Sequence, residues 1–327
     1  MKSKAASVLQ IVALAVATVG WSLSAIAGEI YIVDDNTIGA YPTSGATVQN
    51  TLVTVVPSEP GITGPPVGVA VSGNNLFVLS PGSSLGGAQL GAYNATTGAT
   101  VNASLPVDLG LVLGVAASGG NLFVANTQNN KISEYTTSGA TVKASLVTGL
   151  NNPSVVAVSG NDLFVANAGT FGSSTEFVPG SGSIGEYNAT TGAVIHKTLV
   201  TGLTSNGNNY PVGIAVSGGN LFVTNLNSVA EYNASTGALE SSSLIPGVVA
   251  PYGIAAFEGN LFVVDAAQST IGEYTTSGSA VNASLITGLG SPTAITVAPE
   301  PSTCVLLTTC AAALLLFRRR AIARSHR

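Results

Sequence analysis

One four-residue pattern recurs along the chain, and it restricts the fold more than any other feature of the sequence. Asn-Leu-Phe-Val occurs four times, Asp-Leu-Phe-Val once and Glu-Ile-Tyr-Ile once, and each copy precedes a segment that ends in tyrosine. The six copies begin at Glu29, Asn75, Asn121, Asp162, Asn220 and Asn260. Self-similarity with a period of about 40 residues indicates a repeat architecture in which each copy is one supersecondary unit.

Each repeat contains four short apolar segments that clusters of Gly, Asn and Ser separate. The first, here called strand a, follows a Pro-x-Gly-Ile-Ala-Val-Ser-Gly pattern that is clearest from Pro211 to Gly218. Strand b is the Asn-Leu-Phe-Val segment, strand c ends in the tyrosine, and strand d carries an Ala-Ser-Leu pattern. Four short strands in about 40 residues are typical of one propeller blade. The sequence therefore predicts an all-β fold, a six-bladed β-propeller with four-stranded blades.

The two ends of the repeat array are offset from each other. The body begins with strand b at residues 29–33 and ends with strand a at residues 291–297. Pairing of these two strands would complete one blade and leave no open sheet edge at the seam. The alternative is an open β-solenoid, which would need polar caps rather than this offset. We therefore expect a ring that is closed by pairing of the N- and C-terminal strands.

The segment from Gly213 to Asn225 reads Gly-Ile-Ala-Val-Ser-Gly-Gly-Asn-Leu-Phe-Val-Thr-Asn. This pattern resembles the repeats of NHL-type and related six-bladed propellers, in which Asp usually stands at the position of Asn225. The resemblance covers the whole body and implies the propeller fold. It implies no particular activity, because such folds host binding modules and enzymes alike.

The first 27 residues have the pattern of a secretory signal peptide. Lys2 and Lys4 give a positive start, and an apolar stretch follows over residues 5–19. Ala25 and Ala27 place small residues at the two positions that signal cleavage requires. The alternative is an uncleaved membrane anchor. In both cases we expect the body to be exported.

The last 29 residues contain a second sorting pattern. Its parts are Pro299, Glu300 and Pro301, then an uncharged apolar run at residues 304–317, then Arg318, Arg319 and Arg320. This order resembles the PEP-CTERM sorting signal of Gram-negative bacteria. The resemblance implies recognition by an exosortase-type enzyme, removal of the tail, and delivery to the cell surface or the exopolysaccharide matrix. The alternative is a lasting C-terminal transmembrane anchor, although the run is shorter than the ~20 residues that span a bilayer.

These patterns divide the chain into a signal peptide (1–27), a propeller body (28–298) and a sorting signal (299–327). The body has 3 Lys and no Arg against 14 Asp and Glu, which gives a net charge of −11. Nucleic acid is excluded as a partner because its recognition needs a basic surface. A glycan or a surface protein is the expected ligand, and we expect membrane contact only through the C-terminal helix before processing.

Polar residues end the six copies of strand b, which suggests one candidate site. They are Asp34, Ser80, Asn126, Asn167, Asn225 and Asp265. In a closed ring they would surround the mouth of the channel, where their oxygen atoms could hold Ca²⁺ or a small polar ligand. The alternative is that each side chain closes a local turn at the end of its strand. We expect no cofactor and no metal; if a metal binds, Asp34 and Asp265 are its predicted ligands.

Loop lengths vary on one face of the predicted ring only. Long b–c loops occur at residues 80–89 and 168–183, and long d–a loops occur at residues 57–66 and 204–210. Because strands alternate in direction, both loop types open on the same face. Insertions confined to one face often mark the binding side of a repeat array.

The body offers few groups for catalysis. His196 is its only histidine and stands beside Lys197 on a predicted outer strand, where we expect a solvated surface residue. The body has no Cys, and no Ser has an evident His and carboxylate partner. The sequence therefore favours an exported, non-enzymatic binding or scaffold protein of the cell envelope or exopolysaccharide matrix. The alternatives are a metal-dependent, lactonase-like hydrolase that uses the channel mouth and a passive structural matrix protein.

Overall fold

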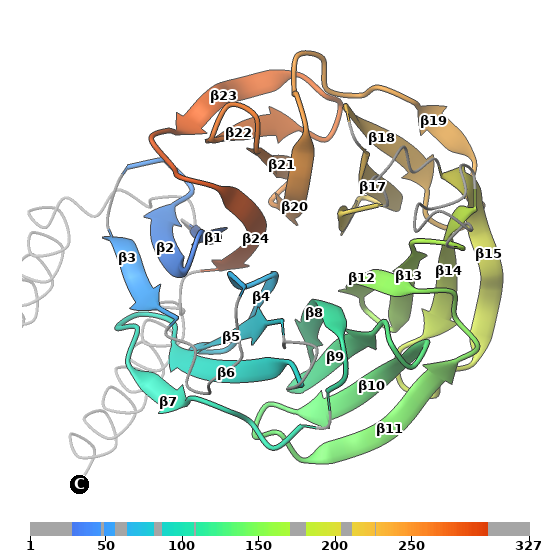
Figure 1. Ribbon diagram of the computed structural model, residues 1–327. Helices are drawn as coiled ribbons and strands as arrows, with labels where there is room; N and C mark the ends of the chain where they lie inside the picture. Colours follow the sequence, from blue (N-terminus) through green and yellow to red (C-terminus); the bar gives the residue numbers. More distant parts are fainter. Residues whose placement is uncertain are drawn as a thin grey trace, which may run out of the picture. The chain divides into compact units, whose positions relative to one another are not determined.

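The computed structural model describes residues 28–46, 49–55, 64–81, 87–107, 109–170, 181–203, 211–225 and 227–299 (Figure 1). The body forms one compact unit. The expected signal peptide with Ala25 and Ala27, and the sorting signal after Pro299, with Glu300, Pro301 and the arginine cluster, lie outside the described residues. Within the described part of the chain, no helix is long and apolar enough to cross a bilayer.

The described residues form twenty-four strands in six four-stranded antiparallel sheets, and this confirms the predicted six-bladed propeller (Figure 1). From the axis outward, blade 1 consists of β24 (Pro292–Pro299), β1 (Gly28–Asp34), β2 (Thr37–Pro42) and β3 (Gln49–Thr54); blade 2 of β4 (Gly68–Ser72), β5 (Asn75–Ser80), β6 (Gln89–Asn94) and β7 (Thr100–Asn102); and blade 3 of β8 (Val112–Ser118), β9 (Asn121–Asn126), β10 (Lys131–Thr136) and β11 (Thr141–Thr148).

The other three blades repeat the order a, b, c, d from the axis outward. Blade 4 consists of β12 (Pro153–Ser159), β13 (Asp162–Asn167), β14 (Gly182–Asn188) and β15 (Val194–Leu203); blade 5 of β16 (Gly213–Ser217), β17 (Asn220–Asn225), β18 (Ser228–Asn233) and β19 (Leu239–Ser241); and blade 6 of β20 (Pro251–Phe257), β21 (Asn260–Asp265), β22 (Thr270–Thr275) and β23 (Ala280–Ile286). Most of the four long loops expected on one face lies outside the described residues.

The first and last strands of the body pair with each other, as predicted from the offset of the repeats. β1 and β24 run antiparallel from the pair Gly28 and Pro299 to the pair Asp34 and Pro292 (Figure 1). Asp34 Oδ1 also accepts the backbone N–H of Ser291 at 2.7 Å. Blade 1 is therefore assembled from both ends of the body, and the closing strand extends through Pro299.

Strand b of each blade packs against two different neighbours, which explains why its pattern lacks polar alternation. In β5, Leu76 and Val78 belong to the core cluster shared with blade 1. Phe77 and Leu79 belong to the cluster shared with blade 3. All four side chains are at most 1% exposed. Six such clusters hold the ring together, one at each boundary between blades.

The tight turn between strands c and d also joins neighbouring blades. Gly98, Gly192 and Gly237 adopt φ angles of +68°, +73° and +68°. A Cβ atom on each would overlap the carbonyl oxygen of a leucine in strand d of the preceding blade; these are Leu52, Leu146 and Leu199, respectively. Only glycine combines the left-handed backbone with this close approach. The turn glycine and the strand d leucine recur together because they meet at the blade boundary.

Burial raises the pKa of six tyrosines in strands b and c above the ordinary value of about 10. They are Tyr31, Tyr41, Tyr93, Tyr187, Tyr232 and Tyr274. The phenolate form is disfavoured because it would lose hydration in the packed sheet. For Tyr31, the nearby Glu29 raises the pKa further, and the Tyr31 hydroxyl donates a hydrogen bond of 2.9 Å to Glu29 Oε2.

These raised pKa values predict a loss of stability in alkali. Below about pH 10 both states keep their phenolic protons, so the tyrosines leave the free energy of unfolding unchanged. Above about pH 10 the unfolded chain releases protons that the folded chain retains, and the free energy of unfolding falls. Urea denaturation at about pH 8 and about pH 11, together with phenolate absorbance, measures this effect. Full ionisation of these tyrosines near pH 10 in the folded protein would contradict it.

Candidate functional site

Three of the six strand-end residues anchor the segment that leads into strand a of their own blade. Asp34, Asn167 and Asp265 each accept a backbone N–H from that segment. The donors are Ser291 to Asp34 (2.7 Å), Asn151 to Asn167 (3.1 Å) and Val249 to Asp265 (2.9 Å). Each side chain therefore connects the end of strand b to the start of strand a, across the same sheet.

Two of the six also close local turns. Asn126 Oδ1 accepts the N–H of Asn129, and Asp265 Oδ1 accepts the N–H of Gln268, both at 3.0 Å. Both bonds run to the third residue along the chain, so these two side chains close local turns, as the alternative interpretation of the sequence has it. Asn126 Nδ2 is buried and has no hydrogen-bond partner among the described residues.

The remaining two strand-end residues, Ser80 and Asn225, stand close to segments outside the described residues. Ser80 is buried and Asn225 is partly buried. None of the six belongs to the residues that line the mouth. In the described ranges, no three His, Cys, Asp or Glu side chains gather as a metal site would require. A ligand or metal role for this ring, Asp34 and Asp265 included, stays a prediction.

Glutamates on strand c, buried or partly buried, are held by partners within their own blades. Glu134, Glu231 and Glu273 each accept a hydrogen bond of 2.7 Å from the asparagine that begins strand b; these are Asn121, Asn220 and Asn260. In blade 4, Asp162 stands at the position of this asparagine. Glu186 there lies 2.7 Å from His196 Nδ1. The side chain of His196 is 49% exposed on the outer strand β15, so the only histidine of the body does not reach the channel.

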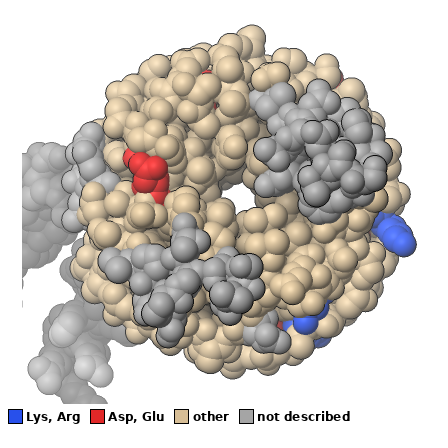
Figure 2. Space-filling model, viewed as in Figure 1, with Lys and Arg blue, Asp and Glu red and all other residues tan. Residues whose placement is uncertain are grey.

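The six strands a surround a central channel, visible as the hole in the middle of Figure 2. A pocket of about 240 Å³ occupies one end of it, and a space of about 270 Å³ occupies the other. One ring of aliphatic side chains borders both spaces: Val69, Val115, Val156, Ile214, Ile254 and Ile295. The first pocket lies where the d–a segments enter the strands, and it forms the channel mouth.

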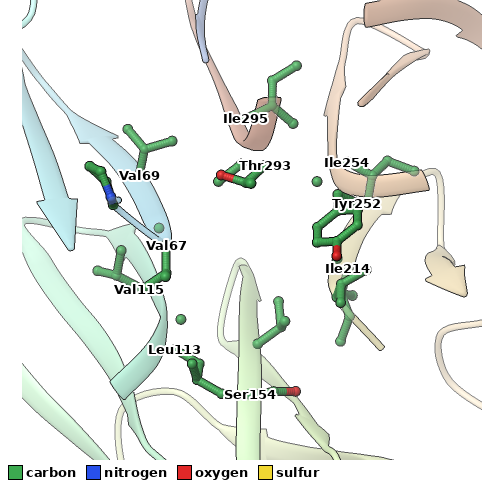
Figure 3. A pocket seen from close by; sticks show the side chains of 18 of the residues that line it. Val67, Val69, Leu113, Val115, Ser154, Ile214, Tyr252, Ile254, Thr293 and Ile295 are labelled. Carbon is green, nitrogen blue, oxygen red and sulfur yellow. The ribbon is translucent and has the colours of Figure 1, made fainter. Parts of the chain in front are cut away.

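The mouth is lined by the variable residue x of the Pro-x-Gly pattern or by the residue at the equivalent position, one from each blade. In blade order these mouth residues are Thr293, Val67, Leu113, Ser154, Val212 and Tyr252. The pattern has diverged in three blades, where Val112 replaces the proline and where Val155 and Ala294 replace the glycine. Figure 3 labels all of the mouth residues except Val212 around the opening. Sequence reasoning overlooked them, although a signal was present. The x position changes from Val to Leu, Ser, Tyr and Thr while the residues around it repeat, as expected where blades share a scaffold but differ at a surface.

The flanking proline and glycine explain why x lies at the mouth. Proline is tolerated at the first position of a strand, where no ladder hydrogen bond is lost, and Pro153, Pro251 and Pro292 begin β12, β20 and β24. The following glycine lets neighbouring inner strands approach closely. A Cβ atom on Gly213 would lie 2.7 Å from the carbonyl oxygen of Tyr252. The channel is therefore narrow, and x stands at its rim.

Among the described residues, none that lines the mouth carries a charge. Most of its side chains are aliphatic, and Tyr252 is the aromatic one, 42% exposed. Ser154 is fully buried, and its hydroxyl is shared between the carbonyl oxygens of Ala166 and Pro211. Thr293 Oγ1 has no hydrogen-bond partner within the described part of the chain. In Figure 2 most of the described surface on this side is likewise uncharged.

Comparison with known proteins supports the fold alone. No protein-family model and no curated protein matches the chain. A chain in the crystal structure of a nidogen/laminin complex superposes with a TM-score of 0.61 at 13% identity, over 83% of this chain and 98% of that chain. A computationally designed protein, Ika8, gives a TM-score of 0.46 at 13% identity, over 81% of this chain and 74% of that chain. At this identity, the first likeness shows that the body is a β-propeller of a known kind.

Proposed function

We propose that this protein is an exported, non-enzymatic β-propeller that binds a ligand at the channel mouth. It acts as a binding or scaffold protein of the cell envelope or exopolysaccharide matrix of a Gram-negative bacterium. The observation that carries the proposal is the uncharged pocket of about 240 Å³ at the mouth. All six blades line it, and their mouth residues are of five different types on a repeated scaffold.

The surroundings of the ionisable side chains favour binding over hydrolysis. General acid–base catalysis needs a titratable group within hydrogen-bond reach of the substrate. The described residues that line the pocket include no Asp, Glu, His, Lys or Cys. A lactonase-like site would further need a group of metal ligands, which the described residues do not gather. A hydrolase is therefore the less favoured function, and the Val212 variant described below tests it.

Sorting by an exosortase-type enzyme forms part of this proposal. The closing strand β24 ends at Pro299, the first residue of the Pro-Glu-Pro pattern. Cleavage beyond that residue would remove the apolar run and the arginines and leave the pairing of β1 with β24 complete. This position of the pattern supports a removable tail.

Mass spectrometry of the mature protein tests the sorting. We expect an N-terminus at Gly28 and a C-terminus shortly after Pro299. Replacement of Arg318, Arg319 and Arg320 with Ser is expected to leave the tail uncut, and the precursor should accumulate in the membrane fraction. A mature chain that still ends at Arg327 would show a lasting anchor and would contradict removal.

A charge introduced into the mouth tests the binding role. We expect Val212→Asp to lower retention of the full chain on extracellular matrix material at least tenfold, because binding would have to desolvate a carboxylate. Val281→Asp is the matched control: it places the same charge on β23, at a side chain that is 55% exposed. Equal retention of both variants and the parent would favour the passive structural role. Lactone hydrolysis lost only in the Val212 variant would favour the hydrolase.

A further inference from the structure

The mouth is amphipathic across its diameter. Tyr252 and Thr293 come from neighbouring blades 6 and 1, and Leu113 of blade 3 lies across the opening from Tyr252 (Figure 3). The exposed ring of Tyr252 offers a flat apolar surface with a polar hydroxyl at its end. A ligand at the mouth therefore meets an aromatic face with a nearby hydroxyl on one side and aliphatic side chains on the other.

Polar groups of the backbone line the channel below its mouth. Every strand a is the innermost strand of its sheet and pairs only with strand b. Its other edge faces the axis, so alternate N–H and C=O groups there lack a strand partner. The side chains that line this deeper part are Val, Ala, Ile and Thr, all uncharged. The channel thus combines a ring of aliphatic side chains with backbone hydrogen-bond donors and acceptors below that ring.

The hydroxyl of Thr293 adds a third observation. Its oxygen is buried and has no partner among the described residues, although the residue lines the mouth. Buried hydroxyls are normally hydrogen-bonded, so a ligand that meets this hydroxyl after rotation of the side chain would supply the missing partner. The described residues of the site offer no cation for an anionic ligand and no carboxylate for a cationic one. The net charge of −11 on the body adds repulsion against polyanions.

We propose that the mouth binds the uncharged end of a glycan, one pyranose unit at a time, with a C–H face of the sugar against Tyr252. This inference rests on the proposed binding function and names its ligand class. The hydroxyl groups of the sugar reach Thr293 and the free backbone groups of the inner strands. The pocket holds about eight water volumes. That space suits one sugar ring and excludes a folded oligosaccharide.

Titration calorimetry of the full chain in detergent tests the ligand class, with methyl glucoside, methyl galactoside and methyl mannoside as neutral probes. Methyl glucuronide is the charged probe, and cyclohexanol is the apolar one. We expect at least one neutral glycoside to bind at least tenfold more tightly than the glucuronide and cyclohexanol. Tyr252→Ala should weaken that binding about tenfold, whereas Tyr252→Phe keeps the ring and should stay within about twofold. Thr293→Val should weaken it about fivefold.

The outcomes separate the ligand class from the proposed function. Stronger binding of the glucuronide or cyclohexanol, or neutral binding that Tyr252→Ala leaves unchanged, would overturn the sugar assignment at this site. Retention on matrix material that is lost in Val212→Asp, with no binding of any glycoside, would also overturn it while the binding function stands. No retention of the parent chain would remove the proposed function itself. Equal thermal unfolding of parent and variants shows that the fold is intact.

Discussion

Replacement of Gly192 with alanine is expected to lower the free energy of unfolding by about 3 kcal/mol, a large share of the stability of an ordinary domain. Two costs add at this position. The φ angle of +73° is left-handed, and alanine there costs about 1 kcal/mol. The new Cβ atom would also overlap the carbonyl oxygen of Leu146 in the preceding blade, and a backbone atom in a packed strand cannot move cheaply.

Gly218→Ala separates these two costs, because only the first applies to it. Gly218 lies in an a–b turn with a φ angle of +60°, and a Cβ atom there would meet nothing within 4 Å. We expect this variant to lose about 1 kcal/mol. Urea denaturation of both variants and the parent gives the difference between them. If both substitutions lower the free energy of unfolding equally, the close contact with the preceding blade does not explain the glycine at position 192.

The same contact explains why much of the fold could be predicted from the sequence. At four of the six blade boundaries a turn glycine meets a strand d leucine, and at the other two it meets residues just after strand d. The pattern therefore carries the inter-blade packing as well as the strands. The repeated strand b also encodes the core, because its alternate side chains pack against the two neighbouring blades. The offset of the first and last repeats then predicts the closure. These features are periodic, and periodicity is what a single sequence displays best.

The site was harder to predict because its residues are the ones that do not repeat. Reasoning from repeats selected the polar residues after strand b, such as Asn167 and Asp265, whose hydrogen bonds mostly serve the loops. The mouth residues Val67, Leu113 and Tyr252 share only their position, directly before the glycine that enters strand a. That they converge follows from ring closure, which places six distant segments around one axis. The bond of Asp34 to Ser291 depends on the same closure, since 257 residues separate the two.

Removal of the closing strand is expected to abolish the cooperative fold. A body that ends at Leu289 would lose β24, and with it the partner strand of β1. Ile30 and Ile32, both fully buried, would lose the cover that Ile295 gives them in the core cluster of blades 6 and 1. Burial of each isoleucine contributes about 2 kcal/mol, and an exposed edge strand also invites aggregation. The matched control is a body that ends at Pro299, which lacks the same tail and keeps β24.

A rearranged chain shows whether pairing, rather than chain length, closes the ring. Glu29 pairs with Ala298 in the register that Asn75 has with Ser72, where a two-residue turn joins strands a and b. Residues 290–298, placed before Glu29 through a Gly-Asn turn, should therefore re-form blade 1 with a–b–c–d order. We expect this permutant to unfold cooperatively in urea, within about 2 kcal/mol of the body that ends at Pro299, because one connection is exchanged for another. If the permutant is as unfolded as the truncated chain, the link between β23 and β24 closes the ring, and the pairing of β1 with β24 does not.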